Sequence, residues 1–310
     1  MTALTLDRIA LTDIGGQPRH LAAEIQRQMR EHLGELPLPI PLGNIATALG
    51  IEEVIERSTE AFEGMLVTSP DKSRGTIVLR AGMVRGRRNF TCGHEIGHFV
   101  NPYHQPPTQG FVCDSAGMKA QRKSAEPWAS RSPFERMEVE ANEFAVSLLV
   151  PPLEFRRERG LLAGCDLRHI EPLAKRFGTS KEVMGRIYVD TASETIGILT
   201  SRHGTLQRFI LPEKFPYLGL SKGRPLPSRS RSASFLGSQV VGAASELEAV
   251  PAEAWLDRSD KSIELFEQAA VQSDGWGMTL LLADEPSDDQ REEDEEVERR
   301  WSEPRFAYGR

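Results

Sequence analysis

The sequence predicts an α+β fold in which a helix packs on a small sheet, followed by a helix-turn-helix segment and a mixed α/β C-terminal domain. Two short β-branched segments, residues 64–69 and 75–82, are separated by a polar turn, which is typical of paired strands. Residues 85–100 follow directly, and we expect them to begin as a strand or loop and to pass into a helix. Apolar residues along this helix indicate that it packs against a core.

Two further helices are expected before the strands, at residues 20–33 and 44–51, with a proline-rich break between them. Residues 101–133 are rich in Pro, Gly, Ser and Gln and show no steady periodicity, which predicts a long functional loop. Helical periodicity returns near Ser132, a suitable N-terminal cap, and ends before Pro151.

The second half of the chain combines helices and strands. Residues 166–189 contain two helical segments joined by a turn at Gly178, which is the layout of a helix-turn-helix. Strands are expected within residues 194–211 and 275–285, and the acidic low-complexity run at 284–300 predicts a solvated, disordered tail. The predicted boundaries are an N-terminal domain at 1–158, a helix-turn-helix-like segment at 159–190, a C-terminal domain at 191–286 and a tail at 287–310.

Composition limits the classes of protein that the chain can belong to. With 310 residues, of which 39% are hydrophobic, it can form a core and two or three small domains. We expect a cytoplasmic protein without membrane contact, because no signal peptide is visible and no apolar run reaches the roughly 20 residues of a membrane span. Three cysteines without CxxC spacing indicate reduced thiols, and a net charge of −7 argues against coating nucleic acid by charge alone.

The chemistry is concentrated in residues 94–98, which read HEIGH and match the pattern HExxH. Two residues four apart share one helix face, so His94 and His98 can reach a single ion. In zinc peptidases with this pattern the ion lowers the pKa of a water to about 7, and the glutamate accepts its proton. Glu95 stands at the position of that glutamate.

A catalytic zinc site needs a third protein ligand, and two candidates are present. His104 follows His94 by ten residues, which is the spacing of the longer pattern HExxHxxGxxH. The glycine of that pattern is replaced by Asn101, which is followed by Pro102, so the match is partial.

The second candidate is Glu138, on the helix expected after Ser132. Glu138, Ala141 and Asn142 fall on one stripe of this helix together with Ala145. The stripe therefore offers a carboxylate ligand, small residues that permit close helix approach, and an amide that can hold a ligand imidazole. Glu140 lies off this stripe and is expected to be a solvated charge.

The two motifs together resemble the ImmA/IrrE family of metallopeptidases. The first motif has the form RxxFTxxHExGH, and the second, further along the chain, has the form ExxANxFAxxLLxPP. The matching residues are Arg87, Phe90, Thr91, His94, Glu95, Gly97 and His98, then Glu138, Ala141, Asn142, Phe144, Ala145, Leu148, Leu149, Pro151 and Pro152. Two motifs in the right order are more specific than either one, and the resemblance implies a minimal zincin domain with an active-site helix packed on a small sheet.

The resemblance also implies a metal site and an activity. It assigns His94, His98 and Glu138 to Zn²⁺, although such mixed sites also accept Mn²⁺ and other divalent ions. It assigns the role of general base to Glu95. The implied activity is a zinc metalloendopeptidase that cleaves a protein partner, namely a DNA-binding transcriptional repressor in a stress or mobile-element response. Longer relatives carry a GAF-like sensor domain where this chain has residues 191–286.

Residues around the HExxH helix are candidates for supporting roles. Asn142 is expected to hydrogen-bond a ligand imidazole. The segment after His98 is longer than in many relatives, and it leaves Tyr103 and His104 as candidates for an oxyanion donor or a substrate contact.

A different class of function is a DNA-binding or partner-binding transcription regulator that uses the zincin domain as a scaffold. The helix-turn-helix favours it, but its second helix offers only Lys181 and Arg186 as cationic readers, which is few for the major groove. Packing against the peptidase domain is the favoured interpretation of these helices. Cys92 and Cys113 are expected to be small buried hydrophobic residues.

Overall fold

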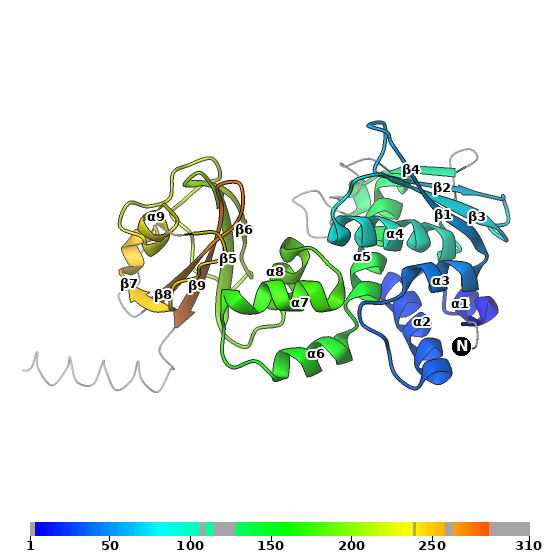
Figure 1. Ribbon diagram of the computed structural model, residues 1–310, viewed down its shortest axis with the longest axis horizontal. Helices are drawn as coiled ribbons and strands as arrows, with labels where there is room; N and C mark the ends of the chain where they lie inside the picture. Colours follow the sequence, from blue (N-terminus) through cyan, green and yellow to red (C-terminus); the bar gives the residue numbers. More distant parts are fainter. Residues whose placement is uncertain (1–3, 106–109, 114–127, 238–239, 258–262, 285–310) are drawn as a thin grey trace, which may run out of the picture. The chain divides into compact units, whose positions relative to one another are not determined.

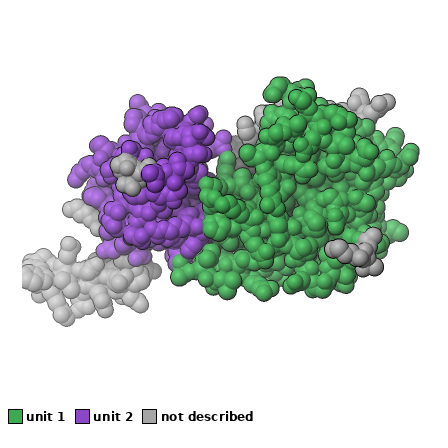
Figure 2. Space-filling view, in the orientation of Figure 1, with its two compact units in different colours: residues 1–163, 171–184 green, residues 164–170, 185–310 purple. Residues whose placement is uncertain are grey.

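The computed structural model describes residues 4–105, 110–113, 128–237, 240–257 and 263–284. The chain divides into two compact units: residues 1–163 with 171–184, and residues 164–170 with 185–310 (Figures 1 and 2). Helices and two separate sheets make the protein an α+β protein, as predicted. The boundaries expected at 158 and 190 stay predictions, and the expected tail at 287–310 lies outside the described residues.

Three helices form the first part of unit 1: α1 (Arg8–Asp13), α2 (Pro18–Leu33) and α3 (Leu42–Leu49). The structure confirms the two helices expected there, α2 and α3. Helix α1 was not expected, because six residues are too few to show a helical repeat of apolar side chains. Its start is fixed by the side chain of Asp7, which accepts hydrogen bonds from the first backbone N–H groups of the helix.

A four-stranded sheet follows, with the order β1-β3-β2-β4. Its strands are β1 (Ile51–Arg57), β2 (Gly64–Thr68), β3 (Gly75–Arg80) and β4 (Gly110–Cys113). Strands β2 and β3 are the expected antiparallel pair; β1 runs parallel to β3, and β4 runs antiparallel to β2. The sequence did not reveal β1 or β4, because β1 lacks clean alternation of apolar residues and β4 lies inside the segment expected to be a loop.

Helix α4 (Arg85–Val100) carries the HExxH motif and contacts β2 and β3 of this sheet (Figure 1). The expectation that its first residues form a strand or loop was wrong, since the helix begins at Arg85. Ion pairs with distant residues stabilise the first turn of α4: Arg87 binds the carboxylate of Glu63, and Arg88 binds Glu56 at 2.7 Å. No local sequence pattern reports such distant partners.

Helix α5 (Pro133–Leu149) has the expected position. Ser132 accepts a hydrogen bond from the backbone N–H of Glu135, and the Glu135 side chain accepts one from the Ser132 N–H. This reciprocal cap satisfies two donors that a helix start otherwise leaves unpaired. The cap therefore fixes the residue at which α5 begins.

Small residues let α4 and α5 pack closely. A methyl group on Gly97 would lie 2.9 Å from Cδ1 of Phe144 and 3.3 Å from Cα of Ala141. One turn earlier, a methyl group on Gly93 would lie 3.4 Å from Cβ of Ala145. Glycine in α4 and alanine in α5 therefore set the separation of the two helices.

Three more helices follow: α6 (Pro152–Gly160), α7 (Ile170–Phe177) and α8 (Lys181–Asp190). Helix α5 ends before Pro151 and Pro152, as expected, and Pro152 occupies the first position of α6, where a missing N–H costs nothing. Between α7 and α8 lies a short turn in which Gly178 has a φ of 67°. A DNA-binding helix-turn-helix at this place stays a prediction.

Unit 2 contains a five-stranded antiparallel sheet with the order β6-β5-β9-β8-β7. Its strands are β5 (Thr195–Arg202), β6 (Thr205–Ile210), β7 (Glu248–Val250), β8 (Glu264–Val271) and β9 (Trp276–Asp284), and a short helix α9 (Arg231–Phe235) precedes β7. The expected hairpin after residue 194 and the expected late strand are both present. The described part of this unit is mainly β.

A buried carboxylate organises the interior of unit 2. Glu267 of β8 is fully buried and accepts hydrogen bonds from the indole Nε1 of Trp255 and from the backbone N–H groups of Arg231 and Ser232. The two backbone donors lie at the start of α9, where a negative charge is favourable. Glu267 is thus satisfied structurally and connects α9 to the sheet.

Within the described residues, no helix is both long and apolar enough to cross a membrane.

We expect Gly97→Ala to lower the free energy of unfolding by about 1–3 kcal/mol, because the added methyl group overpacks the crossing of α4 and α5. Gly43→Ala in α3 is the matched control, since nothing lies within 4 Å of its added methyl group. The control should be neutral or stabilising by at most about 1 kcal/mol. Urea denaturation measures both variants, and equal stabilities would contradict the close crossing.

Candidate metal centre

Helix α4 places His94, Glu95 and His98 in the interior of unit 1. All three side chains are fully buried. The Nε2 atoms of the two histidines lie 3.0 Å apart, as the four-residue spacing on one helix face predicts. Two buried ring nitrogens that face each other need a shared partner, and a cation can be that partner.

Helix α5 brings Glu138 to the same point. Its Oε2 lies 3.5 Å from Nε2 of His94, and its Oε1 lies 3.3 Å from Nε2 of His98. One turn later, Asn142 Oδ1 lies 2.8 Å from Nδ1 of His94. Because the amide oxygen accepts, it selects the tautomer of His94 with a proton on Nδ1, which leaves the Nε2 lone pair directed at the cluster.

His104 is close to His98 but faces its other ring nitrogen. The Nδ1 atoms of the two histidines are 3.0 Å apart, and His104 Nε2 lies 3.0 Å from Oε2 of Glu140. Asn101 Nδ2 is also 3.0 Å from that Nε2 and donates to the backbone of Gly16. Glu140 is therefore a partner of a buried histidine, contrary to the expectation that it is a solvated charge.

Tyr103 is separate from the cluster. The residue is 71% exposed, and its ring lies beside Gly16, where an added methyl group would meet it. Its backbone N–H donates to the side chain of Asn101. The structure thus places Tyr103 at the surface, whereas the two histidines of the motif and Glu138 are buried.

The sequence allowed a metal role for Cys113 but favoured a small buried hydrophobic residue, so Cys113 was not placed in the cluster. It is buried at the end of β4, as expected, but its Sγ lies 3.7 Å from Nε2 of His98 and 3.6 Å from Oε1 of Glu138. The sequence carries only a weak sign of strand β4, because Phe111 and Val112 are its only large apolar residues and they lie in the segment expected to be a loop.

The residues that could hold a metal ion are His94, His98, Cys113 and Glu138, whose ligand atoms all lie within 4.8 Å of one another. Imidazole, thiolate and carboxylate are the donors that Zn²⁺ takes in proteins. Glu138 Oε2 has no hydrogen-bond partner in the described part of the chain, although it is buried. The donor set and this unpaired oxygen both fit a cation.

The electrostatics of the cluster favour a neutral His98 and an ionised Glu138. Burial lowers the pKa of His98 to about 3, so that the imidazole is neutral and its lone pair is available. Burial acts to raise the pKa of Glu138, but its close contacts with the imidazoles of His94 and His98 outweigh it and hold the pKa below its usual value. Burial raises the pKa of Glu95 to about 7. Glu138 therefore stays ionised, which is the form in which a carboxylate binds a metal ion.

A buried lysine fixes the end of α4. Lys72, in the turn between β2 and β3, donates from Nζ to the backbone oxygens of His98 at 2.8 Å and Asn101 at 2.7 Å. Carbonyls at the end of a helix lack partners within the helix, and a cation is favourable there. Lys72 thus anchors the turn of α4 that carries His98.

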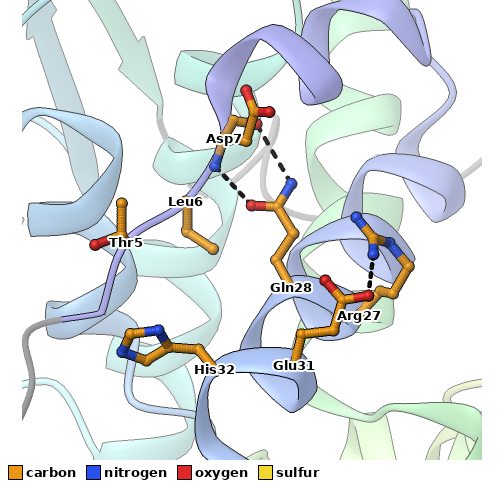
Figure 3. A pocket seen from close by; sticks show the side chains of 7 residues that line it. All are labelled: Thr5, Leu6, Asp7, Arg27, Gln28, Glu31 and His32. Atoms are coloured by element: carbon orange, nitrogen blue, oxygen red, sulfur yellow. Dashed lines mark hydrogen bonds and ion pairs between the residues drawn. The ribbon is translucent and has the colours of Figure 1, made fainter.

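A surface pocket of about 430 Å³ lies elsewhere in unit 1, at the start of the chain and along α2. Figure 3 shows its polar side chains directed at one another: Gln28 binds the backbone of Asp7, and Arg27 binds Glu31. These groups already satisfy each other, and the pocket contains none of the cluster residues. The buried cluster is therefore the candidate site.

A helix with two buried histidines one turn apart, packed on a small sheet and facing a glutamate from a second helix, defines a zincin-like domain. Residues 46–187 match the model of the Peptidase_M78 family, described as the IrrE N-terminal-like domain. The match confirms the resemblance to the ImmA/IrrE family over these residues.

Two further comparisons were made. No curated protein matches the chain. Among solved structures, a Mycobacterium tuberculosis transcriptional regulator is similar at 15% identity and a TM-score of 0.41, covering 89% of this chain and 74% of that one. At this identity and TM-score the likeness carries no functional argument.

We expect Lys72→Met to lower the free energy of unfolding by about 1.5–3 kcal/mol, because it removes charged hydrogen bonds to two buried carbonyls. Lys222→Met is the control, since Lys222 is exposed and surface changes of this kind usually stay within about 0.5 kcal/mol. Chemical denaturation measures the difference. A loss no larger than that of the control would contradict the anchoring role.

Proposed function

We propose that the chain is a zinc-dependent endopeptidase that cleaves a protein partner, a DNA-binding transcriptional repressor. The observation that carries this proposal is the buried group of His94, His98 and Glu138, with Glu95 beside it, inside a Peptidase_M78 domain. The nature of the substrate is taken from the resemblance to the ImmA/IrrE family.

His94, His98 and Glu138 would hold the ion. Zinc in such a site polarises a substrate carbonyl and lowers the pKa of a water. The neutral imidazole of His98 and the ionised carboxylate of Glu138 are the forms that bind a metal ion. Mn²⁺ is a second divalent ion that this donor set would accept.

Glu95 is the proposed general base. Its carboxylate lies against Gly64 at the start of β2, where any larger side chain would overlap it. Neither of its carboxylate oxygens accepts a hydrogen bond from the residues that the structure describes. The carboxylate is therefore available to accept a proton and to return it to the leaving amine.

Supporting residues would orient the ligands. Asn142 holds His94 by its Nδ1, and the pair of His104 and Glu140 holds His98 by its Nδ1. Loss of such outer partners typically weakens metal binding by about 10–100-fold. These three residues are proposed to position the two imidazoles.

The alternative function, a DNA-binding regulator, has weaker support. Lys181, one of the two cations of α8, lies 2.7 Å from Oε2 of Glu171, whose other oxygen binds Lys175. A shared carboxylate lowers the charge that these lysines offer to phosphate groups. Proteolysis of a DNA-binding protein is therefore the favoured route to control of transcription.

Metal content measured by elemental analysis tests the ligands. We expect the purified wild type to contain a single zinc ion per chain, and His98→Ala and Glu138→Ala to lose it, because each removes a proposed ligand. His20→Ala is the matched control, since His20 is exposed, and His104→Ala should retain zinc with weaker affinity. Loss of zinc in His98→Ala and His104→Ala, with zinc kept in Glu138→Ala, would favour the longer HExxHxxGxxH arrangement instead.

Glu95→Gln separates proteolysis from regulation by binding. We expect this variant to keep zinc but to lose cleavage, because an amide cannot accept the proton. In cells that express either form, a survey of protein N-termini should reveal new termini within a DNA-binding protein only with the wild type. Identical termini in both, with zinc bound and salt-sensitive DNA binding intact, would support the regulator instead.

A further inference from the structure

The pairing of β4 with β2 places Cys113 beside the cluster. Cys113 is the last residue of β4 and stands opposite Gly64 of β2 in the antiparallel register. Its backbone oxygen accepts a hydrogen bond of 3.0 Å from the N–H of Glu63. The position of Sγ is therefore set by strand pairing.

The distances around Cys113 are those of a tetrahedral zinc site. With Zn–S of about 2.3 Å and Zn–N of about 2.0–2.1 Å, the sulfur and a ligand nitrogen of such a site are about 3.6 Å apart. The observed separations of Sγ are 3.7 Å from Nε2 of His98 and 3.6 Å from Oε1 of Glu138.

The remaining edges of the cluster also agree with one ion at its centre. Nitrogen and oxygen ligands of a tetrahedral zinc lie about 3.3 Å from one another. The Nε2 atoms of His94 and His98 are 3.0 Å apart, and Glu138 oxygens lie 3.5 Å and 3.3 Å from them. The four distances that join the two Nε2 atoms, Oε1 of Glu138 and Sγ of Cys113 are thus compatible with ligands around a single ion, and Oε2 of Glu138 is the oxygen nearer to His94.

The fourth position is the one that a peptidase keeps for water. Glu95, the proposed base, lies against Gly64, and Gly64 is the strand partner of Cys113. The thiol therefore stands on the side of the cluster that Glu95 faces. A catalytic zinc site has three protein ligands and an open position, whereas a site with four protein ligands is closed.

We propose that Cys113 is a fourth metal ligand that closes the site, so that the peptidase is latent in this conformation. The proposal rests on the metal site of the proposed function. Opening requires the side chain of Cys113 to move away from the other three ligands, which frees the fourth position for water. Strand β4 is suited to such movement, because it is short, ends the sheet order and pairs with β2 over four residue pairs.

Cobalt substitution tests the sulfur ligand in the full-length chain. Co²⁺ bound to a thiolate gives an intense charge-transfer band in the near ultraviolet, which nitrogen and oxygen ligands do not give. We expect the band in the wild type and in Cys92→Ala, since Cys92 is buried but lies outside the cluster. We expect Cys113→Ala and Cys113→Ser to lose the band and to bind the metal at least about 10-fold more weakly.

X-ray absorption on the zinc-loaded wild type needs no variant and covers the case in which the Cys113 variants fail to fold. The proposal predicts a single sulfur at about 2.3 Å together with nitrogen or oxygen ligands at about 2.0–2.2 Å. A bound metal with only nitrogen and oxygen neighbours, or a band that persists in Cys113→Ala, would overturn the role of Cys113 and leave the proposed peptidase intact. A chain that takes up neither metal would overturn both.

Discussion

The close crossing of α4 and α5 is the constraint on which the candidate site depends. Gly97 and Gly93 in α4 meet Ala141 and Ala145 in α5, and side chains of ordinary size would push the helices apart. Glu138 lies on the same face of α5, one turn before Asn142. The separation of the two helices therefore determines whether its carboxylate reaches the two imidazoles of the motif. Stability and chemistry are thus coupled at one contact, because the residues that permit dense packing also set the distances between the proposed ligands.

Around this crossing, the proposed ligands are held by residues from several elements. Asn142 fixes one imidazole from α5 itself, while His104 and Glu140 fix the other through a chain of hydrogen bonds. Lys72 reaches the end of α4 from the turn between β2 and β3. A site built in this way is pre-organised, since ligand positions are set by folding and little rearrangement is needed when an ion binds.

The parts of this arrangement that the sequence predicted are those with a local signature. The two histidines of HEIGH share a helix face. The cap at Ser132 predicted the start of α5, and the spacing of Glu138, Ala141 and Asn142 predicted the face of α5 that carries the proposed ligand Glu138. The place of Cys113 beside the cluster could not be predicted, because it follows from the pairing of β4 with β2, which joins segments far apart in the chain. The partnership of Glu140 with His104 was missed for the same reason: a glutamate in a helix looks like a solvated charge until its tertiary neighbour is known.

The central claim is that one metal ion lies between α4 and α5, bound by His94, His98 and Glu138. Crystals grown with zinc and measured on both sides of the zinc absorption edge test this claim most directly. The account predicts an anomalous difference peak within about 2.0–2.2 Å of both Nε2 atoms and a Glu138 carboxylate oxygen. A fully occupied zinc elsewhere, with no peak between the two helices, would contradict it.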